Sequence, residues 1–241
     1  MPRFYVPDPL AAGLLIDLPE AVAHHLHVLR LQIGAELILF NGDGAEYLAH
    51  LASVEKRRAS ASIKVQIARE AELPYAITLA QAMPEGSKMD WIIEKAVELG
   101  AAAIVPLAAR RSVVRLAGER AQKRRTHWQA VVVSASEQCG RNRLAQVGQL
   151  DEFAQWITQQ DMHKRVLLSP RGAQSLASWA AHQPPQALTL MIGPEGGFTE
   201  EEEAAAQAHG ALVLSIGPRV LRTETAGLAA LAALNALWGG F

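Results

Sequence analysis

The stretch that decides the fold is TLMIGPEGGFTEEEE, residues 189–203. An apolar run ends at Gly193, and a loop of Gly, Pro and Glu leads to Thr199, which has Glu202 three positions later. Thr followed by Glu at this spacing is a capping box, so a helix is expected to begin at Thr199. A strand, a glycine-rich loop and a helix in this order predict a ligand loop at the carboxyl edge of a parallel sheet. A tight turn without a ligand is the alternative for this loop taken alone.

A second loop repeats the arrangement 24 residues further along, in IGPRVLRTETA, residues 216–226. Gly217 and Pro218 follow a strand-like run, and three charged residues surround the start of the next helix. Glycines let a ligand touch bare backbone amides and carbonyls. The two loops are therefore expected to hold one small molecule between them.

Strands and helices alternate on both sides of these loops. Strands are predicted at 77–83, 102–107, 165–170, 187–193 and 211–217, and helices at 86–100, 117–136, 174–181, 199–209 and 223–238. Gly100 is placed to cap the first of these helices. This alternation predicts an α/β fold with a mostly parallel sheet covered by helices on both faces.

The N-terminal part has a different pattern. Short strands at 14–18, 35–40 and 60–67, a hairpin-type turn at 41–44 and one helix from Pro19 to Arg30 predict a small barrel of the kind that docks on RNA. The segment REAELPYA, 69–76, is the predicted boundary. We therefore expect a domain of residues 1–72 and a second of residues 73–241.

Charge is concentrated in one region. The net charge of the 241 residues is only −1, but residues 110–143 hold nine Arg or Lys against two Glu. We assign the block 110–125 and the stretch 54–60 to contact with an RNA backbone, which predicts binding that weakens steeply with salt. A solvated helix face is the alternative.

Other features exclude several classes of protein. The single cysteine, Cys139, permits no internal disulfide, and the first residues lack the apolar run of a signal peptide. The most apolar stretch, 226–238, is shorter than the roughly 20 residues that span a bilayer. We expect a cytoplasmic protein with no membrane partner.

No dinucleotide fingerprint or phosphate loop occurs, and His24, His25 and His27 lack metal-ligand partners, so no metal is expected.

The two loops and four further motifs resemble one family. HHLHVLRL (24–31), KMDWIIEKAVELGAAAIVPL (88–107), SEQCGRNR (136–143) and LLSPRG (167–172) occur in order along nearly the whole chain. Together with MIGPEGGFTEEE and IGPRVLRTETA they are similar to the RsmE-type 16S ribosomal RNA (uracil-N3)-methyltransferases, enzymes of the SPOUT class with a trefoil knot. Ile192, Ile216 and Val220 are conservative departures from the family's more usual loops.

The resemblance implies a fold, a cofactor and partners. It implies a PUA-like RNA-binding barrel, a knotted C-terminal α/β domain that binds S-adenosylmethionine, and a homodimer that acts on 16S rRNA of the small ribosomal subunit. The alternatives are a related knotted methyltransferase for another RNA position, such as a ribose 2′-hydroxyl, and a non-catalytic RNA-binding or assembly factor. The last helix is apolar nearly all round, so it is either buried or shared with a second copy.

The resemblance also implies site residues. Those matching the cofactor loops are Leu168, Ser169, Pro170, Gly193, Pro194, Glu195, Gly196, Gly197, Ile216, Gly217, Leu221, Arg222, Thr223, Glu224, Thr225 and Ala226. The catalytic candidates are Arg141, Arg143, Glu195 and Arg222. For Arg141 and Arg143 a role confined to phosphate contact is an equal alternative. Capping a loop amide is the alternative for Glu195.

RNA-binding residues are expected on both domains. They are basic or polar residues of the first helix and of the basic region: His24, His25, Arg30, Arg110, Arg111, Arg115, Arg124, Arg125, Arg141, Asn142 and Arg143.

Overall fold

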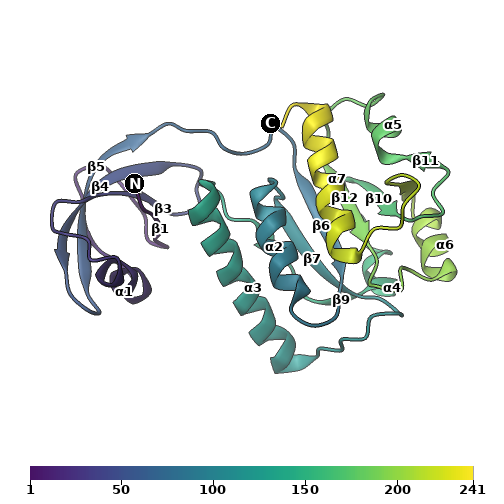
Figure 1. Ribbon diagram of the computed structural model, residues 1–241, viewed down its shortest axis with the longest axis horizontal. Coiled ribbons are helices and arrows are strands. Elements are labelled where there is room, and N and C mark those ends of the chain that lie inside the picture. The colour runs from purple at the N-terminus through teal and green to yellow at the C-terminus, as the bar shows by residue number, and fades with distance from the viewer. Residues whose placement is uncertain (241) are drawn as a thin grey trace. The chain divides into compact units, whose positions relative to one another are not determined.

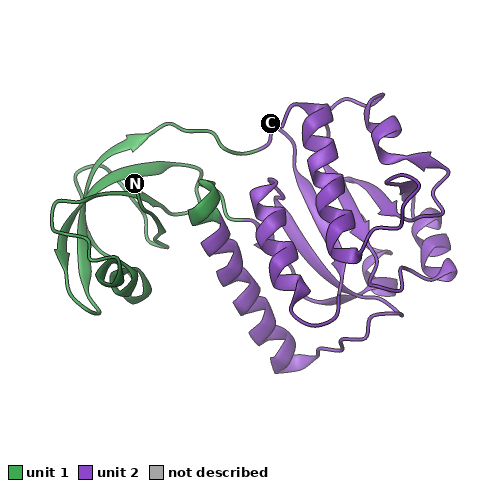
Figure 2. Cartoon of the chain, viewed as in Figure 1, with its two compact units in different colours: residues 1–72, 136–144 green, residues 73–135, 145–241 purple. Residues whose placement is uncertain are grey.

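The computed structural model describes residues 1–240 and divides them into two compact units (Figures 1 and 2). The N-terminal unit contains Met1–Glu72 and Ser136–Leu144, and the C-terminal unit contains Leu73–Ala135 and the chain from Ala145 onward. The sequence placed residues 136–144 in the second domain, whereas the structure groups them with the first. Two contacts explain this grouping: the Tyr5 backbone N–H donates to the Glu137 carboxylate at 2.9 Å, and Arg141 pairs with Glu72.

The N-terminal unit is a five-stranded sheet with one helix. The sheet order is β1-β3-β4-β5-β2; β1 and β3 are parallel and the other neighbours antiparallel. The elements are β1 (Arg3–Tyr5), β2 (Leu15–Asp17), α1 (Glu20–Val28), β3 (Glu36–Phe40), β4 (Glu46–Val54) and β5 (Ala59–Ile67). The helix packs its buried residues, such as Leu26, into a core shared with the strands.

Local sequence explains most of this unit. The predicted hairpin at 41–44 joins β3 to β4, and both of its glycines have positive φ, as such turns require. Pro19 is the N-cap of α1 rather than its first helical residue, and Arg30, with φ of 55°, follows the end of the helix. The strands β1 and β4 were not predicted. Nine consecutive residues of β4 form a strand because it pairs with neighbours on both sides.

The C-terminal unit is built on a parallel sheet, as predicted, but the sheet has eight strands, and the two-residue strands β8, β9 and β11 were not predicted. The strand order is β11-β13-β10-β12-β6-β7-β8, with β9 also paired to β7. The strands are β6 (Ile77–Ala82), β7 (Ala103–Ala108), β8 (Gln146–Val147), β9 (Asp151–Glu152), β10 (Lys164–Leu168), β11 (Gln174–Ser175), β12 (Leu188–Ile192) and β13 (Leu212–Ser215). The helices are α2 (Lys88–Glu98), α3 (Gly118–Cys139, whose last turn belongs to the N-terminal unit), α4 (Phe153–Trp156), α5 (Leu176–Ala180), α6 (Glu200–Ala208) and α7 (Thr223–Trp238).

Helices cover both faces of this sheet (Figure 1). Side chains alternate along β12: Leu188, Leu190 and Ile192 pack in a core with α2, α5 and α7, and Met191 packs in the core that contains α4 and α6. All five residues of β12 are buried, which explains why its sequence is an almost continuous apolar run. The predicted glycine cap is confirmed, since Gly100 has φ of 85° just after α2.

Candidate active site

Three loops meet at the carboxyl edge of the C-terminal sheet. They follow β13, β10 and β12, which are adjacent in the sheet, so the β10 loop with Ser169 and Pro170 lies between the two Gly-Pro loops. Their residues line a cavity of about 210 Å³. The structure thus brings together segments that are separated by up to about 50 residues in the chain.

Thirteen of the sixteen predicted cofactor residues line this cavity. They are Leu168, Ser169, Pro170, Gly193, Pro194, Glu195, Gly196, Gly197, Ile216, Gly217, Leu221, Thr223 and Ala226. Arg222, Glu224 and Thr225 do not line it. Arg222 is the exposed N-cap residue of α7, and its carbonyl oxygen accepts from the backbone N–H groups of Thr225 and Ala226.

The loop after β12 has two positions at which the backbone geometry requires or strongly favours glycine. A Cβ atom on Gly193 would lie 2.8 Å from the backbone nitrogen of Phe198. Gly197 has φ of 68°, and its N–H donates to the Pro194 carbonyl at 2.8 Å, which closes the turn. Only glycine fits the first position for steric reasons, and glycine is strongly favoured at the second by its backbone conformation.

The predicted capping box is present. The Thr199 N–H donates to Glu202 Oε2 at 2.9 Å, and the Glu202 N–H donates to Thr199 Oγ1 at 3.2 Å. The other carboxylate oxygen of Glu202 accepts from the Arg110 N–H at 2.8 Å. This buried glutamate therefore fixes both the start of α6 and the chain that follows β7.

One hydroxyl ties the two Gly-Pro loops together. Thr223 Oγ1 donates to the Gly193 carbonyl oxygen at 2.6 Å and accepts from Gln81 Nε2 at 2.9 Å. Gln81 is fully buried on β6, and its Oε1 is a buried acceptor without a hydrogen-bond partner among residues 1–240. The sequence analysis missed Gln81; a polar residue inside the otherwise apolar strand 77–83 was the available signal.

Glu195 is held by contacts that the sequence did not predict. Its Oε1 accepts from Lys88 Nζ at 2.5 Å and from the Glu85 N–H at 3.1 Å. Burial alone would raise the pKa of Glu195, but these donors hold that pKa below its ordinary value, and the same contact raises the pKa of Lys88. Glu224 Oε2 lies 3.9 Å from the same Lys88 nitrogen.

Three arginines line the cavity. Arg111 Nη1 donates to the Gly196 carbonyl oxygen at 2.7 Å, and Arg171 pairs with Glu203 at 2.8 Å. Arg219 is exposed on the loop after β13. Arg171 and Arg219 were absent from the predicted site, and Arg111 was predicted only for RNA. Ile192, Phe198, Glu203 and Val220 complete the lining residues that were not predicted.

The remaining RNA candidates differ in accessibility. Arg110, Arg115 and Arg124 are exposed, whereas Arg125 is half-buried and donates from Nε to the Val147 carbonyl oxygen at 2.9 Å. In the N-terminal unit, the exposed candidates are His24, His25, Arg30 and Arg143, and the buried ones are Arg141 and Asn142.

Residues 1–240 contain neither a metal-binding cluster nor a membrane-spanning helix. No group of three His, Cys, Asp or Glu side chains in this range has the arrangement of a metal site. No helix in the same part of the chain is both long and apolar enough to cross a membrane.

Comparison with known proteins gives consistent matches. Residues 71–235 match the RNA methyltransferase domain family, and residues 18–64 match the RNA methyltransferase PUA domain family. A ribosomal RNA small subunit methyltransferase E of Bacillus subtilis is 37% identical over 90% of this chain and 87% of its own length.

Solved structures agree with these matches. The ribosomal RNA small subunit methyltransferase E of Neisseria gonorrhoeae, bound to S-adenosylmethionine, is 39% identical with a TM-score of 0.92, over 99% of this chain and 98% of its own. A Legionella pneumophila protein in complex with the same cofactor is 36% identical with a TM-score of 0.91, over 97% and 96% of the two chains.

Proposed function

This chain belongs to the RNA methyltransferase family of the ribosomal RNA small subunit methyltransferase E proteins, and from that premise we propose that it transfers a methyl group from S-adenosylmethionine to small-subunit ribosomal RNA. The observation that carries this proposal is that all three predicted loops line one and the same cavity. Loops at the carboxyl ends of parallel strands are where such sheets bind their ligands.

The residues of the cavity fit the cofactor. S-adenosylmethionine has a flat adenine, ribose hydroxyls and a charged amino-acid end. Leu168, Ile192, Ile216 and Leu221 supply apolar surface suited to the adenine. The crowding at Gly193 keeps that position free of a side chain, so backbone amides and carbonyls remain available for the polar groups.

Bound S-adenosylmethionine supplies an electrophilic methyl group on a sulfonium sulfur. The chain must hold the acceptor atom in line with this group, exclude water and provide for the proton that leaves the acceptor. Holding two reactants in a reactive geometry lowers a barrier by several kcal/mol. The Thr223–Gly193 hydrogen bond and the Thr199 capping box contribute by fixing the loops before the ligands arrive.

We assign Glu195 to loop fixation rather than to proton transfer. A general base works best when its pKa lies near the operating pH. The contacts with Lys88 and the Glu85 N–H move the pKa of Glu195 the other way, and they also join the loop after β12 to the start of α2.

The proposed acceptor is N3 of a uridine in 16S rRNA, on the strength of the family resemblance. Uracil N3 carries a proton in neutral water, so it becomes a good nucleophile only when that proton leaves. A nearby guanidinium would stabilise the uracil anion that results. A ribose 2′-hydroxyl and a non-catalytic assembly role remain the competing functions.

The RNA is proposed to contact exposed basic residues of both units, which in the N-terminal unit are His24, His25, Arg30 and Arg143. Arg110, Arg111 and Arg115 precede α3, and Arg124 lies on it. Arg171 and Arg219 are two further exposed basic residues, and both line the cavity. Counterion release then predicts an affinity that falls steeply as salt rises.

We also propose a homodimer in the cytoplasm. Leu228, Ala229, Ala232 and Ala233 are only partly buried on α7, and Leu237 is 45% exposed, so one apolar face of this helix is available for a second copy. Sedimentation at micromolar concentration should give twice the 26.0 kDa chain mass, and Leu237→Glu should lower it. Cytoplasmic location follows from an rRNA substrate, and a trefoil knot in the C-terminal unit follows from the family.

The decisive experiment offers the purified protein tritiated S-adenosylmethionine with unmodified small ribosomal subunits and, separately, their protein-free RNA. Label on uracil N3, detected also as a reverse-transcription stop, would establish the reaction and the preferred form of the substrate. Label on a ribose would favour the first alternative. Cofactor binding without label on either RNA would favour the assembly role.

A further inference from the structure

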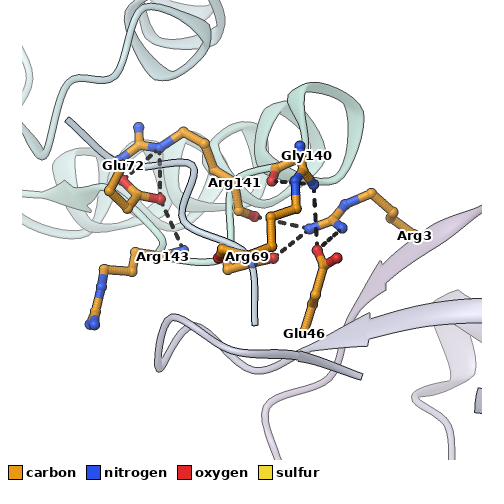
Figure 3. Close-up of polar contacts among 8 residues, drawn as sticks. Arg3, Glu46, Arg69, Glu72, Gly140, Arg141 and Arg143 are labelled. Atoms are coloured by element: carbon orange, nitrogen blue, oxygen red, sulfur yellow. Dashed lines mark hydrogen bonds and ion pairs between the residues drawn. The ribbon is translucent and has the colours of Figure 1, made fainter. Parts of the chain in front are cut away.

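The segment that follows α3 is held in place by charged residues of the N-terminal unit (Figure 3). Gly140 has φ of 85°, the left-handed conformation that ends many helices. Arg69 lies against this glycine: its Nη1 donates to the Gly140 carbonyl oxygen at 3.1 Å, and a Cβ on Gly140 would lie 2.8 Å from Nη2. The chain therefore turns sharply after the helix in a backbone conformation that favours glycine, and a side chain at this position would displace the Arg69 guanidinium.

Glu72 binds this segment twice. Its Oε2 accepts from Arg141 Nε at 3.0 Å and from Nη2 at 2.5 Å, while its Oε1 accepts from the backbone N–H of Arg143 at 3.3 Å. The side chain of Arg141 is only 5% exposed. One carboxylate thus fixes both the guanidinium of Arg141 and the backbone of Arg143.

Asn142 is fixed from the opposite side. Arg3 Nη2 donates to Asn142 Oδ1 at 2.6 Å, and Arg3 Nη1 pairs with Glu46 at 2.5 Å. Asn142 is 2% exposed. Neither Arg141 nor Asn142 reaches RNA without breaking buried contacts.

Arg143 has the opposite environment. Its side chain is exposed, and within residues 1–240 its guanidinium has no hydrogen-bond or ion-pair partner. Figure 3 shows it directed away from Glu72. It lies beside the β3–β4 turn, where a Cβ on Gly44 would be 2.7 Å from Nη2. Its charge is therefore unneutralised while its backbone is fixed.

We propose that Arg143 contacts a phosphate of the RNA substrate and that Arg141 is a positioning residue, which acts through Glu72 to hold the Arg143 backbone. This inference rests on the proposed function, and it decides between two arginines that the sequence left equivalent. Moving Arg141 onto RNA would leave Glu72 partly buried without its main partner, whereas the Arg143 guanidinium breaks no hydrogen bond or ion pair within residues 1–240 when it binds phosphate. Arg also matches phosphate geometry better than Lys does.

The first test measures binding of the full chain to protein-free small-subunit rRNA over a range of salt concentrations. Arg143→Ala should weaken binding about fivefold to tenfold near 0.15 M salt and lower the slope of log affinity against log salt by about 0.7 to 0.9, the value of one phosphate contact. Lys64→Ala is the matched control, since Lys64 is an exposed cation on β5 of the same unit. It should leave the slope unchanged. Equal effects of the two variants would overturn the proposal.

The second test uses the sign of a charge change. Glu72→Gln removes a negative charge, so simple attraction to RNA predicts tighter binding. If Glu72 and Arg141 position Arg143, the variant should instead bind RNA about threefold more weakly, because the carboxylate that holds the Arg143 backbone is gone. Tighter binding with a steeper salt slope would show that released Arg141 contacts phosphate itself, and would overturn its assignment. Arg141→Lys, which keeps the charge and loses the two-point contact, should weaken binding as Glu72→Gln does.

Methyl transfer separates this inference from the proposed function. Arg143→Ala should raise KM for RNA and leave kcat at saturating RNA unchanged. A lower kcat with unchanged KM would place Arg143 in the chemical step and overturn the proposal. If the wild-type chain neither binds nor methylates the RNA, the proposed function falls and the inference with it. If the wild type methylates while Arg143→Ala behaves as Lys64→Ala does, only the inference falls.

Discussion

Thr223 Oγ1 lies 2.6 Å from the Gly193 carbonyl oxygen, and this hydrogen bond joins the loop after β12 to the start of α7. The same hydroxyl accepts from Gln81, so one side chain links β6, the loop after β12 and α7. Thr223 is 6% exposed, which means that water cannot readily replace either partner.

Thr223→Val should weaken binding of S-adenosylmethionine about tenfold, since removing a buried hydroxyl leaves the Gly193 carbonyl and the Gln81 amide short of a partner, at a cost of about 1–3 kcal/mol. Titration calorimetry would measure the change. Thr158→Val is the control, because the Thr158 hydroxyl also donates to a backbone carbonyl but is exposed and does not line the cavity. Equal affinities for the two variants would contradict this account of the loops.

Gly193→Ala and Gly196→Ala should differ in effect. At position 193 the new Cβ meets loop backbone at 2.8–2.9 Å, and such overpacking costs about 1–3 kcal/mol, which corresponds to roughly fivefold to 150-fold in cofactor affinity if the whole cost falls on the bound state. At position 196 the nearest atom, at 3.1 Å, belongs to the flexible side chain of Arg111. That variant should bind within a few-fold of wild type. A larger loss at 196 than at 193 would be incompatible with the loop geometry.

The Lys88–Glu195 pair should titrate only at extreme pH. The pKa of Glu195 is below its ordinary 4.5, so its contribution to stability is complete above that value and is lost as pH falls through the folded-state pKa. The pKa of Lys88 is above 10.5, so its contribution is lost only as pH rises beyond that. Lys88→Met should raise the pKa of Glu195, measured by carbon NMR of its carboxyl group, and Lys95→Met should not. An unshifted pKa in Lys88→Met would exclude the contact in solution.

Arg141→Ala should destabilise the N-terminal unit by about 3–5 kcal/mol, because it leaves Glu72 without its main ionic partner in a largely buried site. Glu72→Ala should have a similar effect for the converse reason. The double variant should lose less than the sum of the two, since both changes remove the same interaction. Denaturant titration of the three proteins tests this, and simple additivity would show that the pair is not coupled.

Much of the C-terminal unit could be predicted from sequence because its determinants are local. The run at 188–192 is apolar because β12 is buried on both faces, and Thr199 with Glu202 specifies the start of α6 within four residues. The loops could be predicted from their glycines, because the backbone conformations that glycine permits are also a local property of the sequence. The resemblance predicted sixteen cofactor residues, and thirteen of them line one cavity.

The contacts that complete the site could not be predicted in this way. Gln81 reaches Thr223 across 142 positions of sequence, and Lys88 reaches Glu195 across 107. Neither the hydrophobic periodicity of a segment nor the spacing of residues within a motif predicts such long-range pairs. The order of the strands is also non-local: β10 pairs with both β12 and β13, which places the Ser169 loop between the two Gly-Pro loops.

The sequence by itself determined the parallel sheet, the two glycine loops and the helix that begins after Thr199, because each depends on the conformational preferences of neighbouring residues. Only the tertiary structure decided which strands are adjacent, which polar groups hold the loops, and that Arg141 is buried against Glu72 while Arg143 is exposed. Two arginines two positions apart are equivalent in a sequence. They differ in the folded chain because burial and pairing are set by residues about 70 positions away.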